Sequence, residues 1–131
     1  MIVVDGPEIG HFVAQKLGIV LTPPFRALGF LADDHRPLAA FVFTKSDADM
    51  ELTAYAERGG ITRGVIRFIA NYVFNQNGCR RLTVRTKKRN RRVLKLAPRY
   101  GFKYEGIQRH FYADDDAVVF GMLRDNCRWL S

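Results

Sequence analysis

Two segments of the sequence carry residue types and spacings that suit the binding of phosphate groups. The first, AERGGITRG (residues 56–64), places Gly59 and Gly60 where an expected strand turns into an expected helix. Glycine has no Cβ, so backbone N–H groups there can approach a ligand closely, and a helix N-terminus carries roughly half a positive charge. With Arg58 and Arg63 on either side, a phosphate or pyrophosphate is the natural occupant. The loop matches neither G-x-x-x-x-G-K-[ST] nor G-x-G-x-x-G, so a plain turn before a capped helix stays open as the alternative.

The second segment is TKKRNRRVLKLAPRYGF (residues 86–102). Only Asn90 interrupts a run of cations formed by Lys87, Lys88, Arg89, Arg91 and Arg92. At ~6 Å in water each neighbouring pair of like charges costs roughly 0.7 kcal/mol. Such repulsion favours an anionic partner: a nucleic acid, a membrane, an acidic protein or a small polyanionic cofactor. A solvated charged loop is the alternative without a ligand.

These segments need a scaffold that positions them. The hydrophobic pattern predicts alternating strands and helices. Helices are expected over residues 7–18, 63–78 and 90–100, and strands over residues 50–56, 80–86, 101–112 and 117–125, with two more within residues 25–44. Thr62 is the expected N-cap of the second helix and Gly78 its C-terminal residue, while Pro98 should kink or shorten the third helix.

The order strand, glycine-rich turn, helix, strand is typical of a crossover unit. It places the strands over residues 50–56 and 80–86 parallel to each other within a mixed sheet. The expected fold class is therefore α+β (mixed α/β). Both phosphate-binding segments then begin at the same end of the parallel pair, where ligands bind in α/β sheets.

Length and composition set further bounds. The 131 residues suit one domain, taken as residues 1–131. No apolar run approaches the ~20 residues of a membrane span and the N-terminus lacks signal-peptide features, so a cytoplasmic location with no membrane partner is expected. Cys79 and Cys127 have no CxxC partner and the histidines are scattered, so no metal site is expected. The net charge of +8 favours anionic partners without naming one.

The stretch LTVRTKKRNRRVLKLAPRYGFKYEGIQRHFY (residues 82–112) resembles the C-terminal half of the GNAT acetyltransferases, in particular the branch that acetylates protein N-termini, of the ribosomal-protein-alanine type. That branch has an Asn after its fifth strand, a Gly-Phe pair whose Phe lies twelve residues later, then Glu-Gly and a basic residue. The matching positions are Asn90, Gly101, Phe102, Glu105, Gly106 and Arg109. Upstream, AERGGITRGVIRFIANYVFNQNGCRRL resembles the acetyl-CoA pyrophosphate loop and its helix. The whole is similar to small stand-alone GNAT proteins of phages and prophages, which would act in the host cytoplasm.

The chain departs from the family pattern in two places, the pyrophosphate loop and the position of the usual tyrosine. The pyrophosphate loop is usually Arg/Gln-x-x-Gly-x-Gly/Ala. With Gly60 as the last glycine, Arg58 stands at the first-glycine position and Tyr55 at the first position. Many members also have a Tyr seven residues after the Asn, where it meets the thiolate leaving group, and this chain has Ala97 there, followed by Pro98. The resemblance therefore supports cofactor binding better than turnover.

The resemblance implies the GNAT-like acyl-CoA N-acyltransferase fold, a twisted mixed sheet with a splayed central parallel pair flanked by helices. It implies acetyl-CoA or coenzyme A as the cofactor, with backbone contacts from Ala54 and Ala56 to the pantetheine arm. Asn90 would hydrogen-bond the pantetheine and Arg99 would lie near the adenosine end. The residues implied at the pyrophosphate are Arg58, Gly59, Gly60, Ile61, Thr62, Arg63 and Gly64. The cations left over are expected to meet an acidic partner or a nucleic acid.

Acetyl transfer needs a neutral amine, a donor for the developing oxyanion and a proton for the leaving thiolate. At pH 7 the neutral form costs an α-amino group (pKa ~7.8) roughly 1 kcal/mol and a lysine (pKa ~10.4) roughly 4.6 kcal/mol. This difference favours an N-terminal or similarly low-pKa amine, on a protein such as a host protein. Glu51 is the first candidate for the base, Tyr55 on the same strand face is a candidate relay, and Tyr112 faces the expected acceptor entrance. For each, a salt bridge or aromatic packing is the alternative role.

Three functions follow from these features. The favoured one is an acetyl-CoA-dependent N-acetyltransferase acting on a primary amine of a protein. The second is a GNAT-fold protein that does not turn over and binds a host or partner protein. A nucleic-acid binder ranks third, because no aromatic residue is interleaved among the cations of residues 87–92 and no helix-turn-helix or zinc pattern occurs. The sequence fixes neither the acceptor nor the oligomeric state, and an oligomer stays open.

Overall fold

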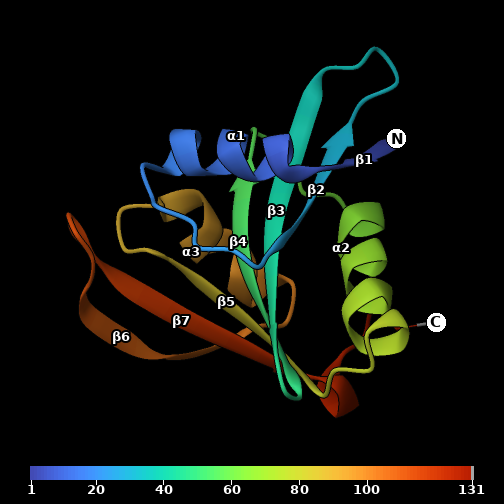
Figure 1. Ribbon diagram of the computed structural model, residues 1–131. Coiled ribbons are helices and arrows are strands. Elements are labelled where there is room, and N and C mark those ends of the chain that lie inside the picture. Colours follow the sequence, from blue (N-terminus) through green and yellow to red (C-terminus); the bar gives the residue numbers. More distant parts are fainter. Residues whose placement is uncertain (131) are drawn as a thin grey trace.

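The computed structural model describes residues 1–130, which form a seven-stranded mixed sheet with helices on both faces (Figure 1). The strands are β1 (Ile2–Asp5), β2 (Arg26–Leu31), β3 (Pro37–Ser46), β4 (Asp49–Ala56), β5 (Arg81–Lys87), β6 (Lys103–Tyr112) and β7 (Asp115–Leu123). The helices are α1 (Pro7–Leu17), α2 (Arg63–Ala70) and α3 (Arg91–Arg99), with a π-helical turn, η1 (Asn71–Gln76), and a 3₁₀ turn, η2 (Arg124–Asn126). The spatial order of the strands is β1-β2-β3-β4-β5-β7-β6.

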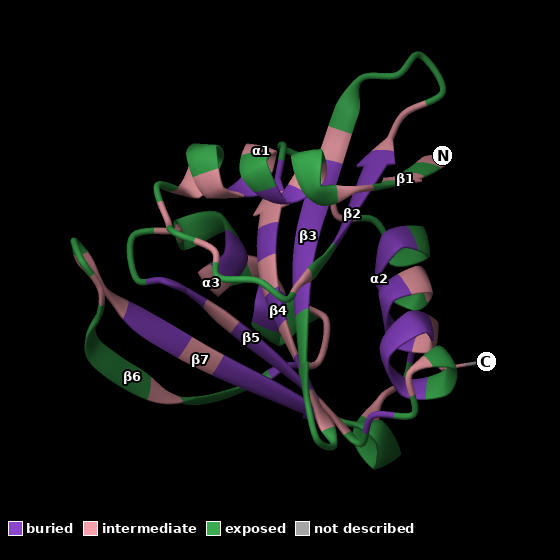
Figure 2. Ribbon diagram, in the orientation of Figure 1, coloured by how far each residue is buried: buried purple, intermediate pink, exposed green. Residues whose placement is uncertain are grey.

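The two faces of the sheet bury different helices. On one face Val13 of α1 packs against Ala27, Ala40 and Val42 of β2 and β3. On the other face, α2 and α3 pack their apolar stripes against β3, β4, β5 and β7, in a cluster that includes Val65, Ile69, Val93, Phe41, Leu52 and Val84. β6 forms one edge and is exposed along most of its length (Figure 2).

One strand pair is parallel and all the others are antiparallel within residues 1–130. β4 and β5 pair in parallel from Asp49 opposite Arg81 to Leu52 opposite Val84, and no further. Both strands continue for several residues, β4 to Ala56 and β5 to Lys87, so they diverge at their C-terminal ends (Figure 1). The predicted mixed sheet with a splayed central parallel pair is therefore confirmed.

Four details differ from the sequence-based prediction. β1 was not predicted, because a strand of four residues before a helix gives little periodicity. The second helix ends at Ala70 and continues as the π-helical turn instead of running to residue 78. Pro98 does not shorten α3, because it lies in the last turn and the helix still reaches Arg99. β7 begins at Asp115, two residues earlier than expected, because the turn before it is tighter.

Candidate functional site

The splayed C-terminal ends of β4 and β5 lie side by side in the middle of the sheet, and each leads into a helix. The hydroxyl of Thr62 caps α2 by accepting a hydrogen bond from the Val65 amide at 3.2 Å, as predicted. Neither α2 nor α3 has an acidic residue in its first turn, whereas α1 has Glu8 there. α2 begins instead with Arg63, and α3 with two arginines. Cations at a helix N-terminus oppose the helix dipole, so the neighbouring N-termini of α2 and α3 favour an anion from outside the chain.

The glycine-rich loop gives its two glycines different roles. Gly59 is exposed with φ +74°, and no atom lies within 4 Å of where a Cβ would be. A Cβ on Gly60, by contrast, would overlap the carbonyl oxygen of Leu38 in β3, and the Gly60 amide donates to the Glu57 carbonyl at 2.8 Å. Gly60 therefore packs the loop onto β3 and does not open it to a ligand, which corrects the role expected from the sequence. The exposed Arg58 makes no ion pair within residues 1–130.

The backbone amides that are free to bind a ligand follow the two glycines, at residues 61–64. Because the Val65 amide bonds to Thr62 and helical bonding begins at Ile66, the amides of residues 61–64 have no hydrogen-bond partner within residues 1–130. Thr62, Arg63 and Gly64 are exposed and Ile61 is half-buried. These backbone donors point from a helix N-terminus, which is the geometry that binds phosphate groups.

An arginine bridges the splay. A guanidinium nitrogen of Arg92 donates to the carbonyl of Ala56 at 2.6 Å, joining the start of α3 to the end of β4. Backbone groups two residues apart face the same side of a strand, so Ala54 also presents its N–H and C=O toward the gap. The side chains of both alanines are buried against the α2 and α3 layer. The sequence placed Ala54 and Ala56 here but did not predict the Arg92 contact.

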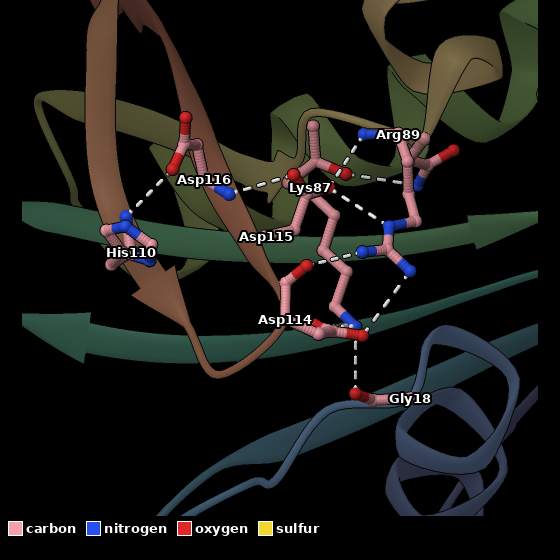
Figure 3. A network of polar contacts seen from close by, with 9 residues as sticks. Gly18, Lys87, Arg89, His110, Asp114, Asp115 and Asp116 are labelled. Carbon is pink, nitrogen blue, oxygen red and sulfur yellow. Dashed lines mark hydrogen bonds and ion pairs between the residues drawn. The ribbon is translucent and has the colours of Figure 1, made fainter.

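Two residues in the run of cations, Lys87 and Arg89, are paired within the chain (Figure 3). The ammonium group of Lys87 is buried, donates to the Gly18 carbonyl at 2.9 Å and lies 2.8 Å from a carboxylate oxygen of Asp114. Arg89 pairs with Asp114 and with Asp115, to which its Nε lies at 3.2 Å. The repulsion that favoured an external partner is therefore relieved in part by the acidic turn between β6 and β7. Lys88 and Arg91 are exposed and make no ion pair within residues 1–130.

These contacts shift the pKa values of the acidic turn. The hydrogen bond from Lys87 lowers the pKa of Asp114. The backbone N–H of Arg89, which donates to the carboxylate at 2.9 Å, lowers the pKa of Asp115. Both carboxylates are therefore ionised at neutral pH.

Asn90 and Arg99 lie at opposite ends of α3. The amide nitrogen of Asn90 donates to the Thr86 hydroxyl at 3.0 Å and does not cap the helix, which leaves the side-chain oxygen available to a ligand. Arg99 is exposed at the C-terminal end, and its carbonyl accepts a hydrogen bond from Arg128. Ala97, in the last turn of α3, is buried in the core.

Two adjoining cavities open on the face that α1 covers. The first, which we name the splay cavity, has a volume of about 190 Å³ and is lined by Lys16, Leu17, Ile19, Thr53, Thr86, Lys87, Arg89, Asn90 and Tyr112. The second, the α1-face cavity, has a volume of about 250 Å³ and is lined by Ile19–Thr22, Phe25, Val42, Thr44, Glu51, Thr53, Arg85, Phe111 and Tyr112. They share Ile19, Thr53 and Tyr112. Thr53 directly follows Leu52, the last paired residue of β4, and Thr86 lies two residues beyond Val84, the last paired residue of β5, so the splay cavity is the opening between the strands.

The candidate catalytic side chains are only partly brought together. Glu51 and Tyr112 line the α1-face cavity, where Glu51 is ion-paired with Arg85. Burial raises the pKa of Tyr112 to about 12. Tyr55 lies outside both cavities and packs edge-on against Phe12 with ring centroids 5.4 Å apart. Burial, and then a hydrogen bond with Glu57, raise the pKa of Tyr55.

Arg85 is the site residue that the sequence interpretation missed. Its Nε donates to the side-chain oxygen of Gln108 at 2.9 Å, and its guanidinium lies 4.7 Å from the centre of the Phe111 ring. The alternation of Arg81, Thr83 and Arg85 in β5 was the available signal, because it places all three on the face of Glu51.

Residues 1–130 contain neither a cluster of metal-binding side chains nor a helix that could span a membrane. No group of three or more histidine, cysteine, aspartate or glutamate side chains there is arranged to hold a metal ion. None of the helices in that range combines the length and apolar character needed to cross a membrane.

Comparison with known proteins identifies the fold. No family model matches the sequence, and no curated protein matches it. Among solved structures, a point mutant of spermidine N-acetyltransferase SpeG from Vibrio cholerae superposes with a TM-score of 0.73 at 9% identity, over 95% of this chain and 96% of that one. Ribosomal-protein-S5-alanine acetyltransferase from Vibrio fischeri gives 0.64 at 13% identity, over 94% and 69% of the two chains. A GNAT-family acetyltransferase from Bacillus anthracis gives 0.63 at 13% identity, over 76% and 66%.

The splayed parallel pair, the two helix N-termini at its edge and these likenesses together define a class. The chain has the fold of the GNAT acetyltransferases. At identities this low the likeness fixes the fold, and the chemistry has to be argued from the chain's own residues.

Proposed function

We propose that residues 1–131 form a single-domain, acetyl-CoA-dependent N-acetyltransferase that acetylates a primary amine carried by a protein. The observation that carries the proposal is the arrangement at the C-terminal ends of β4 and β5, where the two strands diverge. There, two helices begin without a first-turn acid and with arginines, beside a gap between parallel strands. A long anion with a narrow neutral arm matches that combination of unpaired backbone donors, cations and gap.

The residues present suit coenzyme A in particular. The free amides of residues 61–64 and the exposed Gly59, with Arg58 and Arg63, would hold the pyrophosphate. The backbone of Ala54 and the side-chain oxygen of Asn90 face the gap and would hold the pantetheine arm. The Ala56 carbonyl would be reached after Arg92 moves or through Arg92 itself. The exposed Arg91 and Arg99 are left for the adenosine end.

Proton transfer would take place where the two cavities meet. Acetyl-CoA, when bound, would supply the acetyl group as a thioester, and coenzyme A would then leave as a thiolate that must be protonated. Tyr112 lines both cavities and, with a pKa of about 12, keeps its proton at neutral pH, so it can donate at that junction. Glu51 can attract an incoming ammonium group, although its carboxylate is already paired with Arg85.

The acceptor is best served by an amine of low pKa. With Glu51 paired and Ala97 at the position of the family's usual tyrosine, the site offers little help with deprotonation. An α-amino group is already about a tenth neutral at pH 7, whereas a lysine is almost wholly charged. This supports a protein N-terminus over a lysine side chain.

The same observations favour a second candidate function. A GNAT-fold protein that binds a host or partner protein without turnover would also carry a paired Glu51 and an apolar residue at position 97. The two functions differ in product formation, and the second allows the protein to act with or without CoA. Mass spectrometry of N-terminal peptides incubated with acetyl-CoA separates them, because only the enzyme adds 42 Da to the peptide.

Calorimetry and thermal unfolding with acetyl-CoA test the proposal directly. We expect micromolar binding, and at a hundred times the dissociation constant roughly 2.7 kcal/mol of added stability. An unchanged melting curve in millimolar acetyl-CoA would contradict both the enzyme and the CoA-binding alternative.

A further inference from the structure

Two residues that line the α1-face cavity carry large apolar side chains exposed to solvent. The connection between α1 and β2 contributes Val20 and Leu21, and the end of β6 contributes Phe111 on another wall. Val20 is 93% exposed and Phe111 50% exposed. Because both side chains line one cavity, an apolar group bound there would remove apolar surface from water, which is favourable.

The charges around the two cavities are almost all neutralised within the chain. In the α1-face cavity the only ionic side chains are Glu51 and Arg85, which pair with each other. In the splay cavity Lys87 and Arg89 pair with the acidic turn. Of the lining residues, within residues 1–130, Lys16 makes no ion pair and no carboxylate is free.

This balance decides what kind of amine can enter. An acceptor with one ammonium group can lie near Glu51, and it has to give up only that one proton, to water, before it reacts. A second or third ammonium group would be desolvated beside Lys16, Lys87 and Arg89 without a carboxylate to pair with, and an unpaired charge in a partly buried site is costly. A group with an apolar side chain next to the amine would instead cover Val20 and Phe111.

We infer that the acceptor amine belongs to an apolar, non-cationic group, with an N-terminal residue of apolar side chain as the fitting chemistry, and that polyamines are rejected. The inference rests on the proposed function for the place of the amine, and it concerns selectivity instead of turnover. It separates this chain from the spermidine acetyltransferases whose fold it shares.

The test compares acceptors by binding as well as by turnover. Three peptides of one neutral sequence that begin with Leu, Ser or Lys, together with spermidine, are titrated into the protein saturated with CoA. The same acceptors are then incubated with acetyl-CoA and the products weighed by mass spectrometry. We expect the Leu peptide to bind about tenfold more tightly than the Ser peptide, and spermidine and the Lys peptide to bind more weakly than either.

Variants locate the selectivity. Val20→Ser should reduce the preference for Leu over Ser several-fold without changing CoA affinity, and Val3→Ser, at an exposed valine of the far edge strand, is the matched control. Arg85→Met frees the carboxylate of Glu51 and should narrow the ratio of Leu-peptide to spermidine affinity about tenfold. The melting temperature of each variant verifies that it is folded.

Two outcomes have different meanings. Spermidine bound or acetylated as well as the Leu peptide, or a flat response across the panel, overturns the inference and leaves the proposed function standing. The expected binding order without any acetylated product supports the inference and contradicts the proposed enzymatic function.

Discussion

Tyr112 lies where the splay cavity and the α1-face cavity meet, and it lines both. Its environment raises the pKa to about 12, chiefly because burial disfavours the charged phenolate. Nearby Arg85 lowers the pKa by a smaller amount. The hydroxyl therefore stays protonated across the physiological range, so it has a proton to donate and cannot act as a base, although the raised pKa makes it a weaker acid than a free tyrosine.

Replacing Tyr112 tests this role. Tyr112→Phe keeps the ring and its edge-on packing with Phe111, so we expect an unchanged melting temperature and CoA affinity. If the hydroxyl protonates the leaving group, kcat should fall roughly 100-fold. Tyr104→Phe, at a tyrosine 61% exposed and turned to the opposite face against Phe120, is the control and should keep kcat within about twofold. A kcat unchanged in Tyr112→Phe would remove Tyr112 from the chemistry.

Gly64 offers a way to separate folding from anion binding. It lies in the first turn of α2, and a Cβ there would meet nothing closer than the Thr62 hydroxyl at 3.7 Å. A carboxylate in that turn complements the helix dipole, worth about 0.3–1 kcal/mol, and loss of glycine from a helix adds up to ~1 kcal/mol. The same carboxylate would repel a bound pyrophosphate.

We therefore expect Gly64→Glu to melt at the same or a higher temperature than the unmodified protein and to lose the stabilisation by acetyl-CoA. Gly64→Ala should gain the helical stability and keep the CoA response. Thermal unfolding with and without acetyl-CoA measures both effects. A Gly64→Glu protein that still binds CoA with full affinity would place the pyrophosphate elsewhere.

At the scale of elements, ion pairs attach the β6–β7 hairpin to β5 and to the run of cations in residues 87–92, which we name the basic segment. Arg81 bridges to Glu105, Lys87 to Asp114 and Arg89 to Asp115. In each case the partner lowers the carboxyl pKa below its usual value. A lowered folded-state pKa adds stability that is complete above the ordinary carboxyl pKa of about 4, and this stability is lost as pH falls through the lowered value.

The double variant Asp114→Asn, Asp115→Asn should therefore be less stable than the unmodified protein at pH 7, and the difference should shrink toward pH 3. Urea unfolding at a series of pH values measures it. Asp125→Asn, at an exposed aspartate without an ion pair in residues 1–130, is the control and should follow the unmodified protein at every pH. A difference that stays constant from pH 7 to pH 3 would show that the turn is not held by these charges.

The unit from β4 to α2 shows where sequence-based prediction succeeds, and the ion pairs of the β6–β7 hairpin show where it ends. β4, the glycine-rich loop and α2 were predictable because strand alternation, Thr62 and the apolar stripe of α2 are local signals. The burial of Lys87 was not, because its partners Gly18 and Asp114 are distant in sequence and meet only when the sheet forms. For the same reason the pairing of Glu51 with Arg85 could be guessed as an alternative but not established. Local patterns therefore give the scaffold and the place where β4 and β5 part, and tertiary contacts decide which charges remain free.

At the scale of the whole molecule, the net charge of +8 invites the question of nucleic-acid binding. The structure narrows the answer for the basic segment. Lys87 and Arg89 are paired with the acidic turn and Arg92 with the Ala56 carbonyl, which leaves Lys88 and Arg91 free to meet phosphates. A segment with two free cations should show a log affinity that falls with log salt at a slope near −2, whereas five would give a slope of −4 to −5.

We therefore expect weak, non-specific binding to labelled single- and double-stranded DNA or RNA, and CoA should compete with it. Fluorescence anisotropy at several salt concentrations, with and without CoA, measures affinity, slope and competition together. Asn90→Ala supplies the matched variant: it should weaken CoA binding by roughly 1 kcal/mol, because one hydrogen bond is lost, and leave nucleic-acid binding unchanged, because no charge is removed. Submicromolar binding at physiological salt, with a steep slope and no response to CoA, would instead require the acidic turn to release Lys87 and Arg89, and would make the basic segment a nucleic-acid site.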